Sequence, residues 1–110
     1  MKLTVWGLKT CDTCRKSIKT LEAAGHEVAF RDIRADPLLT GEIAGLVETF
    51  GAAAVNRKST TWRGLDEAER GQDPGALLAQ HPTLMKRPVI YADGAFHIGW
   101  TQDVQAALGV

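Results

Sequence analysis

The sequence has few of the residues that metal sites and disulfide scaffolds require. Only two of its 110 residues are cysteines, and its three histidines are scattered at positions 26, 81 and 97. Two cysteines make at most one disulfide, and a structural zinc site needs about four ligands. We therefore expect no metal site, with zinc bound by scattered ligands as the weaker alternative.

Excess charge and long apolar runs are also absent. The 13 Lys and Arg residues balance the 13 Asp and Glu residues, so the composition gives no case for direct binding of nucleic acid or of a membrane surface. No apolar run approaches the roughly 20 residues that span a bilayer. The first residues also lack the apolar core and cleavage site of a signal peptide. We expect a cytoplasmic protein, in which a cysteine pair is catalytic or sensing.

What the sequence does contain is Cys11-Asp12-Thr13-Cys14, placed between a strand and a helix. Residues 3–6 are rich in β-formers and Gly7 ends that run, after which an amphipathic helix begins. Asp12 or Thr13 is expected to cap this helix. Cys-x-x-Cys in this context is typical of thioredoxin-like redox sites.

Cys11 is expected to be the nucleophile, because the amides and dipole at a helix N-terminus favour a thiolate. Such positions lower a cysteine pKa from about 8.5 to roughly 3.5–7.5. Lys9 adds positive charge, and Thr10 adds a backbone amide. Cys14, one turn further on, is placed to resolve a mixed disulfide. A pair of inert cysteines is the alternative that the residues leave open.

The remaining pattern predicts an α/β fold in a single domain, residues 1–110. It consists of a four-stranded mixed sheet flanked by helices, with a helical insertion of about residues 40–82 between strands 2 and 3. The expected strands are 27–31, 88–91 and 95–98, and the later helices are 40–50, 65–70, 73–81 and 101–108.

Local signals complete this assignment. Thr40, Asp73 and Thr101 are expected to cap helices, and His26 is expected to be an exposed turn residue. Residues 56–63 show no clear period. They predict a loop, either simply solvated or rich in donors for a ligand.

Arg87-Pro88 opens the third strand. In a thioredoxin-like fold, a proline here follows a cis peptide bond and lies beside the Cys-x-x-Cys loop. We therefore expect Pro88 to follow a cis bond, with the backbone of Arg87 near a bound substrate and its guanidinium directed toward Cys11. A proline that merely starts an edge strand is the alternative.

Three segments together resemble the ArsC-like arsenate reductase and Spx family, and most closely its YffB-type small thiol reductases. They are WGLKTCDTCRKSIKTLEAAGHEVAFRDIRADPL, NRKSTTWRGL and PTLMKRPVI. Their order and spacing match the family across the whole chain. The resemblance implies a thioredoxin-like fold with a helical insertion and a nucleophilic Cys11. It also implies that an adduct at Cys11 is resolved with glutathione and glutaredoxin.

In the arsenate reductases of this family, three arginines hold the oxyanion. Arg57 (or its neighbour Lys58) and Arg87 match two of them, but residues 97–101 read His-Ile-Gly-Trp-Thr where the third should fall. Losing a bidentate donor weakens oxyanion binding. The resemblance then favours a glutathione-linked thiol–disulfide reductase that uses Cys11 and Cys14, with glutathione as co-substrate and no bound cofactor.

The complete Cys-x-x-Cys motif also resembles a second group within this family, the Spx-type proteins. Spx-type members use this motif as a disulfide switch and bind RNA polymerase through a contact that depends on a mid-chain glycine. Gly51 lies in the corresponding region. A redox-sensing regulator and an arsenate reductase proper therefore stay as alternatives.

Overall fold

The computed structural model describes residues 1–110, which form two compact units. The first unit combines Met1–Ala35 with Arg87–Val110, and the second is Asp36–Lys86. The expected helical insertion, residues 40–82, falls inside the second unit, whose bounds are slightly wider.

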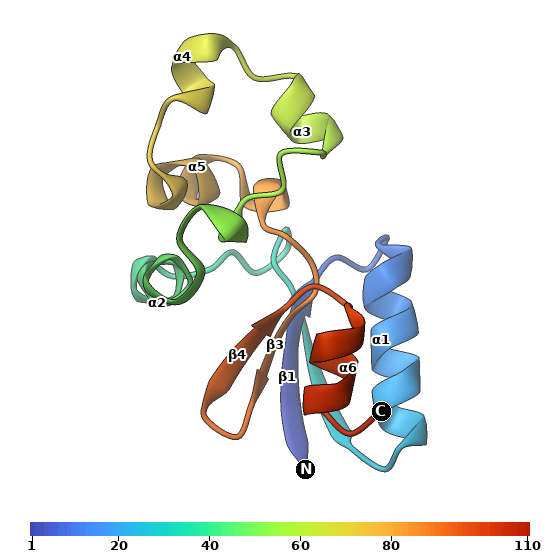
Figure 1. The fold of residues 1–110 in the computed structure, drawn as a ribbon. Helices are drawn as coiled ribbons and strands as arrows, with labels where there is room; N and C mark the ends of the chain where they lie inside the picture. Colours follow the sequence, from blue (N-terminus) through green and yellow to red (C-terminus); the bar gives the residue numbers. More distant parts are fainter. The chain divides into compact units, whose positions relative to one another are not determined.

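The first unit is built on a four-stranded mixed sheet of order β2-β1-β3-β4 (Figure 1). β1 pairs in parallel with β2 and antiparallel with β3, and β3 pairs antiparallel with β4. The predicted α/β sheet is therefore confirmed. The elements of this unit are β1 (Lys2–Gly7), α1 (Asp12–Ala23), β2 (Glu27–Asp32), β3 (Val89–Ala92), β4 (Ala95–Ile98) and α6 (Gln102–Ala107).

The core of the first unit lies on the sheet face that α1 and α6 cover (Figure 1). Alternate residues of a strand point to one face, so Leu3 and Val5 of β1 face the helices together with Ile90 of β3. Leu21 comes from α1, and Leu108 follows α6. Burying this stripe ties both helices to the strand that leads to Cys11.

The link between β3 and β4 is the expected two-residue hairpin. Asp93 and Gly94 have φ angles of 50° and 78°. Positive φ at both central positions is the type I′ geometry whose twist matches paired strands. The antiparallel pairing predicted from Asp-Gly is confirmed.

The second unit is helical. Buried Ile43, Leu46, Leu77, Leu78 and Leu84 supply much of its apolar interior. Its elements are α2 (Thr40–Phe50), η1 (Gly51–Ala54), α3 (Thr60–Arg63), α4 (Glu67–Arg70), α5 (Pro74–Gln80) and η2 (Pro82–Leu84).

Three local expectations were wrong. Thr40 is the first residue of α2 rather than its cap, and the Leu39 amide ahead of it donates to Glu42 Oε1 at 2.8 Å. Residues 60–63 form α3, because Ser59 Oγ accepts from the Trp62 amide at 3.1 Å and starts a helical turn. His26 is half-buried, with Nε2 at 3.2 Å from the Leu108 carbonyl oxygen.

The caps predicted at Asp73 and Thr101 are confirmed, since each side chain accepts from the backbone amide three residues later. None of the helices combines the length and the apolar character that crossing a membrane requires.

Candidate redox site

The site begins with a tight turn between β1 and α1. The Cys11 amide donates to the Leu8 carbonyl at 3.1 Å, which places Lys9 and Thr10, both exposed, at the tip of the turn. The Lys9 amide donates to Asp32 Oδ2 at 3.1 Å. The turn is thus fixed by its own backbone and by the last residue of β2.

Asp32 is a positioning residue that the sequence analysis did not single out. Its carboxylate accepts from the amides of Lys9 and Arg34, the second at 2.9 Å, and these bonds hold the pKa of the carboxyl below its usual range. The predicted parallel pairing of the first two strands could have identified Asp32, because this pairing sets Asp32 beside Gly7, at the start of the turn.

Cys11 itself occupies the N-cap position of α1, with φ −85° and ψ 116°. The expectation that Asp12 or Thr13 would cap the helix was wrong. No side chain accepts a capping hydrogen bond at this end of the helix. Asp12 is the first residue of α1, and its carboxylate pairs with the Arg15 guanidinium. The negative charge of Asp12 is therefore engaged by a guanidinium.

The Cys11 thiol is half-buried, and its pKa is lowered. Partial burial opposes ionisation, but the Cys14 amide and thiol, the positive charge of Arg87 and the Thr13 amide together outweigh it. Each of these groups stabilises a negative charge on sulfur. These surroundings favour a thiolate at Cys11.

Cys14 is fully buried on the inner side of α1. Burial and the neighbouring Cys11 together raise the pKa of its thiol to about 12, against the Leu8 amide and the charge of Arg87. A Cβ atom at Gly7 would lie 2.4 Å from Cys14 Sγ. Only glycine at position 7 leaves room for this sulfur.

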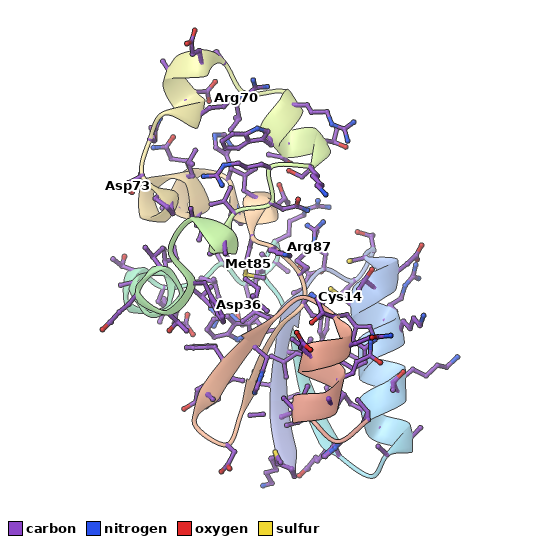
Figure 2. The ribbon with its side chains drawn as sticks, in the orientation of Figure 1. Cys14, Asp36, Arg70, Asp73, Met85 and Arg87 are labelled. Carbon is purple, nitrogen blue, oxygen red and sulfur yellow. The ribbon has the colours of Figure 1, made fainter.

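The Arg87–Pro88 peptide bond is cis, as predicted. Pro88 is buried, and its carbonyl accepts from the Gly99 amide at 2.8 Å. Arg87 is half-buried and close enough for its charge to act on both cysteines. Figure 2 shows it near Cys14 and the start of α1.

The first unit therefore brings together Cys11, Cys14, Lys9, Thr10, Arg87 and Pro88. Arg57 belongs to the second unit, where its guanidinium carbon lies 5.4 Å from the centre of the Trp62 ring. Residues 97–101 are joined to the start of β3 by the hydrogen bond from the Gly99 amide to the Pro88 carbonyl, and they contain no arginine. Nowhere do three His, Cys, Asp or Glu side chains converge as a metal site would require.

The chain is similar to several known proteins over nearly its whole length. A curated relative, an uncharacterized protein of Haemophilus influenzae, is 39% identical over 96% of this chain and 97% of its own length. The solved structure of a YffB protein superposes with a TM-score of 0.87 at 28% identity, covering 96% of this chain and 97% of that one. The global transcriptional regulator Spx of Bacillus subtilis is 28% identical over 92% of this chain and 82% of its own length.

The family profile described as the ArsC family matches residues 6–108. That range begins at the end of β1 and runs through the Cys-x-x-Cys turn, the second unit and the β3–β4 hairpin to the end of α6. The fold is thioredoxin-like, as its structural neighbours are. The chain belongs to the ArsC family.

Proposed function

We propose that this chain is a thiol–disulfide reductase, with Cys11 as nucleophile, Cys14 as resolving cysteine and glutathione as co-substrate. The observation that carries the proposal is the contrast between the two sulfurs. One is half-buried at a helix N-terminus that faces Arg87, and the other is enclosed one turn further along the same helix. An oxidoreductase of the ArsC family fits this arrangement.

The proposed first step is attack of the Cys11 thiolate on one sulfur of a disulfide substrate. A bond forms between the two sulfurs, the substrate S–S bond breaks, and the leaving thiolate takes the electron pair. The lowered pKa of Cys11 increases the fraction of thiolate at a given pH, and the thiolate is the attacking species.

The second step transfers the oxidation to Cys14. Its thiol gives up a proton and attacks Cys11 Sγ, which forms the Cys11–Cys14 disulfide and releases the second half of the substrate as a thiol. Two glutathione molecules then reduce the protein and leave as oxidised glutathione. Glutathione can also attack the Cys11 adduct directly, and glutaredoxin is a candidate protein partner for that step.

Lys9 and Arg87 are proposed to bind carboxylates of the substrate, with the Thr10 backbone and the Arg87–Pro88 segment beside it. Arg57 is proposed as a further cationic group for the ligand. A dithiol that turns over needs a reducing compartment, so the proposed location is the cytoplasm.

The first test is intact mass after exposure of the reduced protein to oxidised glutathione. Cys14→Ser should trap one glutathione on the protein, while wild type should proceed to the loss of two hydrogens. Cys11→Ser should do neither. A Lys19→Gln variant, which removes one exposed positive charge about two turns further along α1, is the matched control and should behave as wild type. Absence of any adduct up to mildly alkaline pH would overturn the proposal.

A second assay separates turnover from a single oxidation. Repeated disulfide reduction with glutathione as electron source should vanish in Cys11→Ser. Turnover that persists in Cys11→Ser would contradict Cys11 as nucleophile.

A redox-sensing regulator is the second candidate, favoured by the complete Cys-x-x-Cys and by the similarity to Spx. Such a protein would bind the α subunit of RNA polymerase differently in its dithiol and disulfide forms and would show no turnover. Pull-down with both forms tests it directly.

Arsenate reduction proper is the weakest of the three readings, because residues 97–101 offer no guanidinium. Turnover of arsenate with glutathione and glutaredoxin, reduced by Arg87→Ala, would restore it.

A further inference from the structure

One tryptophan in the second unit carries two guanidinium groups. The guanidinium carbons of Arg57 and Arg70 lie 5.4 Å and 5.6 Å from the centre of the Trp62 ring. Arg70 is labelled beside α4 in Figure 2. Both distances are within the range of cation–π attraction.

The two arginines differ in what else they contact. Arg70 Nε donates to the Trp62 carbonyl at 3.2 Å, and another of its nitrogens donates to the Arg63 carbonyl at 3.2 Å. The exposed Arg57 guanidinium makes no hydrogen bond or ion pair within the protein, so its contact with Trp62 is what holds it. Arg70 therefore braces the backbone of α3, whereas all the donors of Arg57 stay available.

The backbone that carries the Trp62 ring is held by hydrogen bonds at both its amide and its carbonyl. The Trp62 amide donates to Ser59 Oγ at 3.1 Å, and its carbonyl accepts from Arg70. Arg63 adds a bond to the Lys58 carbonyl at 2.9 Å, which closes the same turn. The Trp62 ring is thus attached to a backbone that is held in place, and its contact with Arg57 restricts the rotamers of that arginine before any ligand binds.

Neighbouring carboxylates do not compete for Arg57. Asp66 caps α4 by accepting from the Glu69 amide at 2.7 Å. Glu69 accepts from the Asp66 amide and lies 3.5 Å from His81 Nε2. A guanidinium that is held by stacking and is free of carboxylates can bind an anion at a smaller entropic cost.

We propose that Trp62 is a positioning residue that holds Arg57 as the receptor for one anionic group of the ligand, a carboxylate or an oxyanion. The inference rests on the proposed function for its choice of ligand, glutathione, but the receptor itself belongs to the second unit. Trp62 does not touch the anion in this scheme. It sets the orientation of the arginine that does.

The test measures non-covalent binding in a Cys11→Ser background, in which no adduct can form. Titration calorimetry with S-methylglutathione reports a carboxylate ligand, and titration with arsenate reports an inorganic oxyanion. Trp62→Leu should weaken binding of the ligand about two- to fivefold, as loss of an exposed cation–π contact does, and Trp62→Phe should retain most of the affinity.

A double-mutant cycle separates positioning from a merely structural role. Arg57→Gln should weaken binding at least as much as Trp62→Leu, and adding Trp62→Leu to Arg57→Gln should have no further effect. Equal weakening by Trp62→Leu with and without Arg57 would overturn the proposal. So would unchanged affinity in Trp62→Leu, or no binding of either ligand.

The binding test of the Arg57 receptor and the adduct test of the proposed reductase can fail independently of each other. Binding of arsenate alone through Arg57 and Trp62 supports the receptor and overturns glutathione as its ligand. A failed adduct at Cys11 overturns the reductase and leaves these binding measurements intact.

Discussion

Gly7 and Cys14 share a space that admits no further atom. A Cβ atom at Gly7 would lie 2.4 Å from Cys14 Sγ and 3.2 Å from its Cβ. The end of β1 and the first turn of α1 therefore meet at the buried sulfur. This contact encloses the proposed resolving cysteine while its partner, Cys11, stays half-buried at the helix N-terminus.

Gly7→Ala should destabilise the reduced protein by about 1–3 kcal/mol, because an overpacked core must shift its backbone. Urea unfolding gives the difference. The control is Gly41→Ala in α2, where an added Cβ meets nothing within 4 Å and should stabilise by about 0.4–1 kcal/mol. The cost of Gly7→Ala should shrink in a Cys14→Ala background, and an undiminished cost there would contradict the clash.

Alkaline pH should destabilise the reduced protein through Cys14. Its folded pKa of about 12 lies above the value of about 8.5 in an unfolded chain, so the thiol stays protonated in the folded state while the unfolded state releases a proton. Stability is complete below the unfolded pKa and is lost as pH rises toward the folded one. Between pH 8.5 and 10 the loss amounts to about 2 kcal/mol relative to Cys14→Ser. If the free energy of unfolding depended on pH in the same way for wild type and Cys14→Ser, the predicted effect of Cys14 would be disproved.

Arg87→Gln should raise the pKa of Cys11, since it removes the positive charge that favours the thiolate. Alkylation by iodoacetamide should then slow at neutral pH, and its pH profile should shift upward. The plateau at high pH should rise slightly, because thiolate nucleophilicity grows with pKa with a coefficient of about 0.4–0.5. Lys19→Gln, which removes one exposed positive charge about two turns further along α1, is the control and should leave the profile in place. Identical profiles for Arg87→Gln and wild type would contradict the role of Arg87.

Asp32→Asn should loosen the turn before Cys11, because a neutral amide accepts the Lys9 and Arg34 amides less strongly than a carboxylate does. Hydrogen exchange at the Lys9 amide should accelerate. The pKa of Asp32 is depressed in the fold, so its contribution is present above the unfolded pKa and is lost as pH falls through the folded one. Wild type should therefore approach the mutant in exchange rate only in acid. Equal exchange at neutral pH would rule out this positioning role.

Much of the fold followed from local patterns. Alternation in 27–31, Asp93-Gly94 and the cap at Thr101 each act over a few residues, and the structure has these elements within a residue or two of their expected bounds. The capping of α1 was different. Asp12 has the chemistry of a cap, but the turn from Leu8 places Cys11 at that position and leaves Asp12 to Arg15.

The sequence by itself determined the family, the order of elements and the presence of two cysteines at the start of a helix, because these depend on residue spacing. Only the tertiary structure decided how the two sulfurs differ. Parallel pairing sets Asp32 beside Gly7, and antiparallel pairing of β3 with β1 brings Arg87 to the cysteines. Burial and charge at a sulfur depend on residues distant in sequence, so no local pattern contains them.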